Sequence, residues 1–191
     1  MKQDIILAGV GGQGILSIAT VIGSAALTEG LYLKQAEVHG MSQRGGDVQS
    51  TLRLSSEPIM SDLVPKGGAD CIVSMEPMEA LRYLPWLKKD GWIITSTAPF
   101  VNIPNYPPIE KIMEKLEFLP HLVALDADAM AKDAGSPRSA NMVLLGAVAA
   151  KLDILQPDAL REGIRRVFGR KGEAIVEANL KAFDAGFEKS M

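Results

Sequence analysis

The stretch DIILAGVGGQG, residues 4–14, decides the fold class of this 191-residue chain. Asp4–Ala8 is a short apolar run that ends in glycines, and Ile15–Leu27 then carries apolar residues at helical spacing. The order strand, glycine turn, helix is the context in which a Gly-x-Gly-x-x-Gly motif acquires meaning. Glycine lets the backbone approach a ligand closely, and a helix N-terminus offers unpaired N–H groups to an anion. We therefore predict a cofactor-binding loop made of Gly9, Val10, Gly11, Gly12, Gln13 and Gly14.

The bulk composition is that of an ordinary globular protein, with 47% apolar and 23% charged residues. We expect a single domain over residues 1–191. A net charge of -3 argues against a general nucleic-acid binder. The one cysteine, Cys71, lies in an apolar run and is predicted to be buried, and a single cysteine excludes an iron–sulfur cluster held by this chain's own thiolates. No secretory or membrane-spanning pattern is present, so we expect a cytoplasmic protein with no membrane partner.

Alternating strand and helix patterns predict an α/β fold. We expect an open, mostly parallel, Rossmann-like sheet with an antiparallel strand and a helical C-terminal segment. The expected strands after the first are Leu31–Val38, Asp47–Leu54, Ala69–Met75, Trp92–Ser96 and His121–Leu125. The expected helices after the first are Met78–Lys89 (shortened or kinked by Pro85), Ile109–Leu116, Asp126–Ala134, Ser139–Leu152, Asp158–Phe168 and Glu173–Lys189.

The strand at Asp47–Leu54 departs from an ordinary dinucleotide-binding unit, which would have a helix there. Its apolar residues alternate with Gln49, Thr51 and Arg53, a period typical of a half-exposed strand near a sheet edge, antiparallel to its neighbours. Glu37 lies about 20 residues after the glycine loop, the spacing of a residue that holds ribose hydroxyls, but the departure weakens a plain nucleotide-binding interpretation.

A second glycine-rich loop, long and polar, precedes this strand. It comprises His39, Gly40, Met41, Ser42, Gln43, Arg44, Gly45 and Gly46. Arg44 is its candidate binding residue, because a guanidinium beside flexible glycine backbone suits bidentate capture of phosphate or carboxylate. The alternative, that Arg44 ties the loop to an acidic neighbour in the same chain, stays open.

Polar residues also begin the most apolar predicted helix. Arg138 is expected to cap its start, and Asn141 to face the glycine loop from inside. For both we favour hydrogen bonding to helix-end backbone, with a contact of Asn141 to a bound cofactor as the alternative. The sequence contains no nucleophile elbow, P-loop lysine or metal-ligand spacing. The chain looks incomplete as a free-standing enzyme, which indicates a subunit of a larger one.

The motifs at Gly9–Gly14, Glu37–Gly46 and Arg138–Met142 resemble the gamma-type domain of 2-oxoacid:ferredoxin oxidoreductases, most of all those acting on indolepyruvate. The resemblance covers nearly the whole chain. It implies a complex that oxidatively decarboxylates a 2-oxoacid to an acyl-CoA and passes electrons to ferredoxin. Thiamine diphosphate and the iron–sulfur clusters are then expected on a catalytic, alpha-type partner subunit. The resemblance further implies that Gly9–Gly14 approaches coenzyme A and that the loop from His39 to Gly46 faces the partner.

Three alternatives remain. Within the family, the chain could serve pyruvate, 2-oxoisovalerate or 2-oxoglutarate instead. Outside it, a stand-alone Rossmann-type dehydrogenase would need a nicotinamide site and a proton donor that the sequence does not offer. A non-catalytic module that senses a nucleotide or an acyl-CoA is the third.

Overall fold

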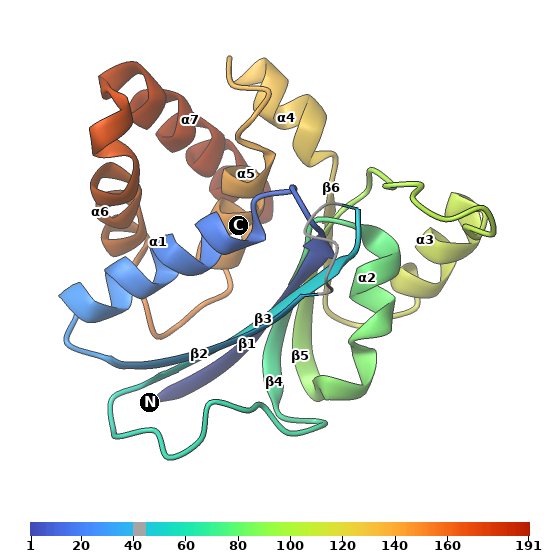
Figure 1. Ribbon diagram of the computed structural model, residues 1–191, viewed down its shortest axis with the longest axis horizontal. Coiled ribbons are helices and arrows are strands. Elements are labelled where there is room, and N and C mark those ends of the chain that lie inside the picture. The colour runs from blue at the N-terminus through green and yellow to red at the C-terminus, as the bar shows by residue number, and fades with distance from the viewer. Residues whose placement is uncertain (40–44) are drawn as a thin grey trace.

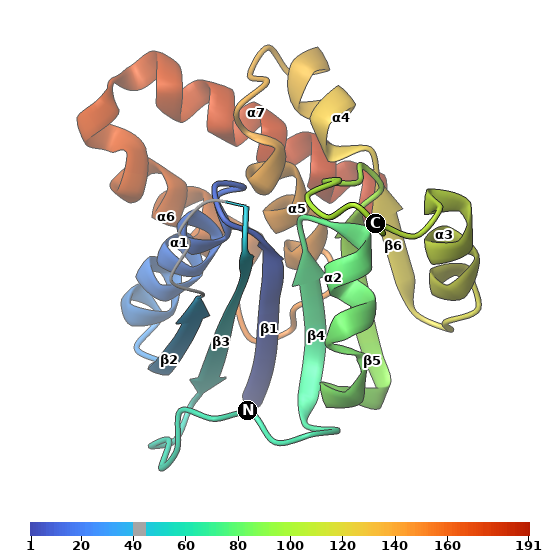
Figure 2. The same ribbon diagram turned by 45° about the vertical axis from the view of Figure 1, so that its right-hand side comes forward.

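The computed structural model describes residues 1–39 and 45–191, with only the backbone of His39, and its centre is a six-stranded sheet (Figures 1 and 2). The strand order is β2-β3-β1-β4-β5-β6. β3 is antiparallel to both of its neighbours, whereas the other pairings are parallel, which confirms the predicted fold class. The strands are β1 (Lys2–Val10), β2 (Tyr32–His39), β3 (Asp47–Ser55), β4 (Ala69–Ser74), β5 (Leu87–Ser96) and β6 (Leu122–Leu125).

Helices cover both faces of the sheet (Figure 1). The first helix and the C-terminal helices pack on one face, whereas α2 and α3 pack on the other. The helices are α1 (Ile15–Thr28), α2 (Pro77–Arg82), η1 (Leu84–Trp86, 3-10), α3 (Ile109–Glu117), α4 (Ala127–Asp133), α5 (Ala140–Ala149), α6 (Pro157–Phe168), η2 (Gly169–Lys171, 3-10) and α7 (Glu173–Ser190). No helix in the described part of the chain is both long and apolar enough to span a membrane.

β1 is the strand on which the two cores meet. Ile5 and Leu7 are fully buried under α1 and α5, whereas Ile6 and Ala8 are fully buried on the face covered by α2 and α3. This burial on both faces accounts for the continuous apolar run at the start of the sequence, where a strand with one exposed face would alternate. Because the glycine loop follows β1, the loop lies near the middle of the carboxyl edge of the sheet.

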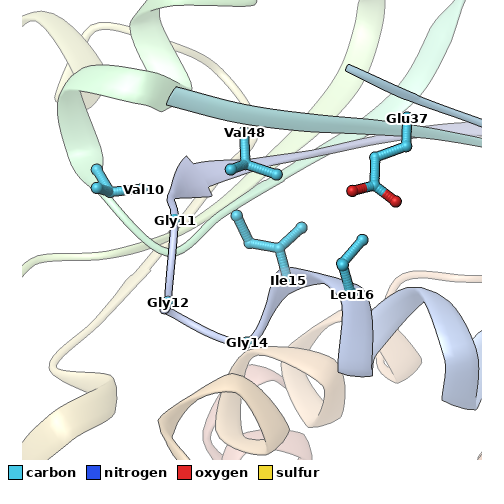
Figure 3. Close-up of a pocket in the computed structure, with 8 residues that line it drawn as sticks. All are labelled: Val10, Gly11, Gly12, Gly14, Ile15, Leu16, Glu37 and Val48. Carbon is cyan, nitrogen blue, oxygen red and sulfur yellow. The ribbon is translucent and has the colours of Figure 1, made fainter. Parts of the chain in front are cut away.

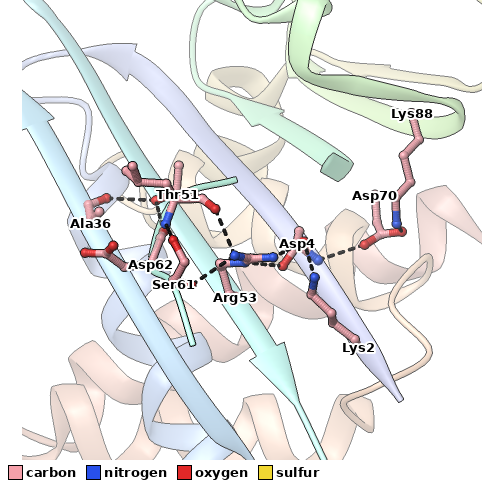
Figure 4. Close-up of polar contacts among 10 residues, drawn as sticks. Lys2, Asp4, Ala36, Thr51, Arg53, Ser61, Asp62, Asp70 and Lys88 are labelled. Carbon is pink, nitrogen blue, oxygen red and sulfur yellow. Dashed lines mark hydrogen bonds and ion pairs between the residues drawn. The ribbon is translucent and has the colours of Figure 1, made fainter. Parts of the chain in front are cut away.

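The predicted exposure of β3 is wrong. β3 lies one strand in from the sheet edge, between β1 and β2, and its side chains Thr51 and Arg53 are buried (Figure 4). Arg53 is buried because Asp4 on β1 accepts two hydrogen bonds from its guanidinium. The alternation of polar residues thus reflects paired polar groups inside the protein rather than contact with water.

The predicted helix over residues 78–89 is too long. α2 ends at Arg82, η1 follows, and residues 87–91 already belong to β5. Pro85 lies in η1 and has no N–H to donate, so the shortening that the sequence predicted at this proline is confirmed.

The most apolar predicted helix is α5, and all of its residues are buried. α5 crosses α7 at two glycines, Gly146 and Gly186. A methyl group on Gly146 would overlap the carbonyl oxygen of Phe183, and one on Gly186 would overlap that of Val143. Since each glycine accepts the backbone of the opposite helix, the C-terminal helical segment packs directly onto the core.

Candidate functional site

The glycine loop between β1 and α1 is held by the side chain of Gln13. Gln13 Oε1 accepts from the Val10 N–H at 2.7 Å, and the Gln13 N–H donates to the Val10 carbonyl oxygen at 3.1 Å. Gln13 Nε2 donates to the Met75 carbonyl oxygen, 3.3 Å away at the end of β4. The sequence singled out this residue as part of a binding motif, whereas its side chain is used to shape the loop and to attach it to the neighbouring strand.

A second attachment comes from α5. Asn141, in the first turn of α5, donates from Nδ2 to the Gly14 carbonyl oxygen at 3.1 Å. Gly14 has a φ of +81°, and a Cβ there would lie 2.6 Å from Asn141 Nδ2. Both the backbone conformation and the close side chain therefore require glycine at this position. The prediction that Asn141 faces the loop is confirmed, through a bond to backbone. Arg138 is exposed and makes no hydrogen bond to any other described residue, so its predicted capping role is wrong.

The described end of the second glycine-rich loop lies against the first. The Gly11 N–H donates to the Gly46 carbonyl oxygen at 2.8 Å, and the Gly45 N–H donates to that of Gly11 at 3.4 Å. Asn102 Nδ2 also donates to the Gly45 carbonyl oxygen, at 2.7 Å. The two loops are thus joined through their backbones.

Several predicted residues of this loop, however, fall outside the described part of the chain. The affected positions are Gly40, Met41, Ser42, Gln43 and Arg44, together with the side chain of His39. Both interpretations of Arg44, as an anion ligand and as an internal tie, stay predictions.

A pocket of about 470 Å³ opens beside the glycine loop (Figure 3). Glu37 on β2 and Val48 on β3 line it, and in Figure 3 the Glu37 carboxylate lies across from Leu16 in the first turn of α1. β3 separates β2 from β1, yet Glu37 still reaches the pocket. The described lining residues are Val10, Gly11, Gly12, Gly14, Ile15, Leu16, Glu37 and Val48.

The pocket offers two kinds of polar contact at different places. The N–H groups of Gly12, Gly14, Ile15 and Leu16 make no hydrogen bond to any other described residue, so they can donate to an anion. Glu37 carries the one charged side chain among the described lining residues, and a carboxylate accepts from hydroxyl or amine groups while it repels phosphate. A ligand that fits both would turn its anionic group to the loop and its hydroxyl groups to Glu37.

Sequence reasoning missed Glu76, which lies two residues after the end of β4 and is fully buried. Its carboxylate accepts from the Glu79 N–H at 3.0 Å, which caps α2, and from the Phe100 N–H at 3.4 Å. It also accepts from the Tyr106 hydroxyl. Burial, and then the bond to Glu76, raises the pKa of Tyr106. The available signal was a glutamate between a buried strand and Pro77 at a helix start.

Among the described residues, no group of three or more histidine, cysteine or acidic side chains is arranged to hold a metal ion. The one cysteine, Cys71, has a raised thiol pKa, mainly because it is buried and to a smaller extent because of the negative charge of Asp70. The site therefore consists of backbone donors, one carboxylate and apolar walls, a set that can bind and position a ligand.

The sequence profile of one protein family, described as pyruvate ferredoxin/flavodoxin oxidoreductase, matches residues 4–189. The chain belongs to this family. Over 97% of its length it is 39% identical to the indolepyruvate oxidoreductase subunit IorB of Pyrococcus horikoshii, of which the match covers 95%.

Two solved structures of the family share the fold. The gamma subunit of a keto/oxoacid ferredoxin oxidoreductase from Geobacter sulfurreducens matches with a TM-score of 0.70 and 28% identity, over 98% of both chains. The 2-oxoglutarate:ferredoxin oxidoreductase of Magnetococcus marinus, solved with 2-oxoglutarate, coenzyme A and succinyl-CoA bound, matches with a TM-score of 0.76 and 25% identity. That match covers 99% of this chain but 31% of the Magnetococcus chain, so there the fold is one part of a longer polypeptide.

Proposed function

We propose that this chain is the non-thiamine-binding subunit of an indolepyruvate, or aryl 2-oxoacid, ferredoxin oxidoreductase. The observation that carries the proposal is the near full-length match to a subunit named for indolepyruvate. The complex decarboxylates the 2-oxoacid oxidatively, transfers the acyl group to coenzyme A and passes the electrons to ferredoxin. Thiamine diphosphate and the iron–sulfur clusters belong to the catalytic, alpha-type subunit, and this chain completes the complex.

The test is anaerobic co-purification of the tagged chain from its native cells. The partner is identified by its thiamine diphosphate content and by iron–sulfur absorbance. The purified pair is then assayed for CoA-dependent ferredoxin reduction with indolepyruvate, pyruvate, 2-oxoisovalerate and 2-oxoglutarate, and each subunit is assayed alone as a control. We expect activity from the pair, none from this chain alone, and the highest kcat/KM with indolepyruvate. A preference for another of these acids would assign the chain to the branch of the family that acts on that acid. A chain that purifies without a partner and binds NAD or CoA would instead favour the stand-alone dehydrogenase or the non-catalytic binding module.

We further propose that the pocket beside the glycine loop contacts coenzyme A. The N–H groups of Gly12, Gly14, Ile15 and Leu16, which have no partner among the described residues, suit a phosphate, and Glu37 suits a ribose hydroxyl. The Magnetococcus relative was solved with coenzyme A bound, which supports the ligand class. Arg44 is the residue that we expect to add positive charge.

Leu16→Glu tests this contact without altering the glycine loop itself. Leu16 is exposed and lines the pocket, so a carboxylate there should repel the CoA phosphates and raise the KM for CoA several-fold in the assembled complex. Leu27→Glu is the matched control, because Leu27 is an exposed leucine at the other end of α1. An equal KM for CoA in both variants would show that CoA binds elsewhere, while leaving the subunit assignment in place.

A further inference from the structure

Residues 97–108, which connect β5 to α3, contain no charged side chain. They rise over the carboxyl edge of the sheet, beside the top of β4 and β5 (Figure 2). Phe100, Val101 and Ile103 are exposed there, with 41%, 68% and 38% of their surfaces accessible. We call these three residues the apolar tip. Three exposed apolar side chains within four residues of an uncharged segment match the composition of an interface core, in which charged residues are depleted.

The segment that carries the apolar tip is fixed to the protein on both sides. Fully buried Glu76 accepts from the Phe100 N–H at 3.4 Å and from the Tyr106 hydroxyl. On the other side, Asn102 Nδ2 donates to the Gly45 carbonyl oxygen at 2.7 Å. The backbone of the apolar tip is therefore pre-organised while its side chains face outward, which lowers the entropy cost of binding a partner.

The Asn102 bond also connects the apolar tip to the candidate site. Gly45 and Gly46 bond to Gly11 in the glycine loop, so a short chain of hydrogen bonds links the tip to the wall of the pocket. Ligands of open α/β sheets bind at the carboxyl edge of the strands, where the tip also lies. A protein that docks on the apolar tip would therefore also cover the opening of the pocket beside the glycine loop.

We propose that the apolar tip docks onto the thiamine diphosphate-binding catalytic subunit of the same complex. This inference rests on the function proposed above and adds the surface through which the chain performs it. The Magnetococcus relative supports this occupant, because there the same fold is built into a polypeptide about three times longer, within one enzyme chain. A carboxyl-edge interface places this chain's pocket next to the subunit with which it shares a reaction.

The test is a binding measurement between the purified full chain and the purified catalytic subunit, by biolayer interferometry under anaerobic conditions. Val101→Asp introduces a charge into the tip, and we expect it to raise the Kd at least about tenfold, as charge insertion at the centre of an interface does. Leu63→Asp is the matched control, since Leu63 is 67% exposed but lies between β3 and β4, at the opposite edge of the sheet. Circular dichroism melting checks that both variants stay folded.

The outcomes separate the docking surface from the proposed function. A raised Kd for Val101→Asp together with an unchanged Kd for Leu63→Asp supports the apolar tip. If the wild-type chain binds and restores ferredoxin reduction but Val101→Asp binds equally well, the docking surface is wrong and the function stands. Equal weakening by both variants also overturns the surface, because the effect would not be local. If the wild-type chain neither binds nor restores activity, the proposed function fails and the inference falls with it.

Discussion

Asp4 and Arg53 form a doubly hydrogen-bonded ion pair between β1 and β3 (Figure 4). Arg53 Nε donates to Asp4 Oδ1 at 2.9 Å, and Nη2 donates to Asp4 Oδ2 at 3.0 Å. Arg53 Nη1 donates in addition to the carbonyl oxygens of Ser61 and Leu63, at 2.9 and 2.8 Å. The hydrogen bond to Asp4 raises the pKa of Arg53 against the opposing effect of burial. One guanidinium thus fixes the antiparallel strand beside β1 and attaches the segment after β3 to the sheet.

Removing this guanidinium should destabilise the fold strongly. In Arg53→Ala the Asp4 carboxylate loses its main buried partner, and breaking such a pair from one side costs about 3–5 kcal/mol of unfolding free energy. Urea denaturation followed by circular dichroism measures the loss. Lys88→Ala is the control, because the Lys88–Asp70 pair is partly exposed and should contribute less than about 1 kcal/mol. Similar losses in both variants would show that the Asp4–Arg53 pair has no special role.

The second prediction concerns the stability of the crossing between α5 and α7. In Gly146→Ala the new methyl group overlaps the Phe183 carbonyl oxygen, so the helices must move apart, and we expect a loss of at least about 2–3 kcal/mol. Gly169→Ala is the matched control, because its φ is -53° and a methyl group there meets no atom within 4 Å. That change should leave stability unchanged or raise it by about 0.5 kcal/mol. A Gly146→Ala chain as stable as the wild type would contradict the close crossing.

Gln13 should govern how tightly the glycine loop is held. Gln13→Ala removes the acceptor of the Val10 N–H and the donor to the Met75 carbonyl oxygen, each worth about 1 kcal/mol. Hydrogen–deuterium exchange followed by mass spectrometry should then show faster exchange in a peptide covering residues 9–14, with exchange in β5 unchanged. Thr20→Ala is a suitable control, because Thr20 is an exposed residue of α1 whose hydroxyl bonds only to the Leu16 carbonyl oxygen one turn earlier in the same helix. Unchanged exchange at residues 9–14 would mean that Asn141 and Gly46 hold the loop without Gln13.

The sequence predicted the parts of the site that are local and missed those that depend on distant partners. The strand, glycine turn and helix follow from spacing along fifteen residues, and they are present as predicted. The burial of Arg53 was not predictable from its own strand, because its partner Asp4 is 49 residues away. Glu76 was missed for the same reason, since its Tyr106 contact spans 30 residues. The contact between Asn141 and the glycine loop was predictable although Gly14 lies 127 residues away in the sequence. A polar side chain at the start of an all-apolar helix needs a hydrogen-bond partner.

The single cysteine, Cys71, can report on unfolding of the whole protein. Cys71 is buried between β1 and β5 on β4, and burial raises the pKa of its thiol, so at pH 8 the group stays a protonated thiol out of reach of solvent. Because the thiolate is the reactive species, Ellman's reagent should not label the native chain on the timescale in which it labels unfolded chain completely. The destabilised variant Arg53→Ala should be labelled faster than the wild type. When unfolding and refolding are fast relative to the reaction of the thiol with the reagent, the labelling rate rises in proportion to the unfolded population. The same reaction in 6 M guanidinium gives the reference for full labelling. Rapid labelling of the wild-type chain in buffer would show that β4 opens locally, and it would place the core around β1 among the less stable parts of the molecule.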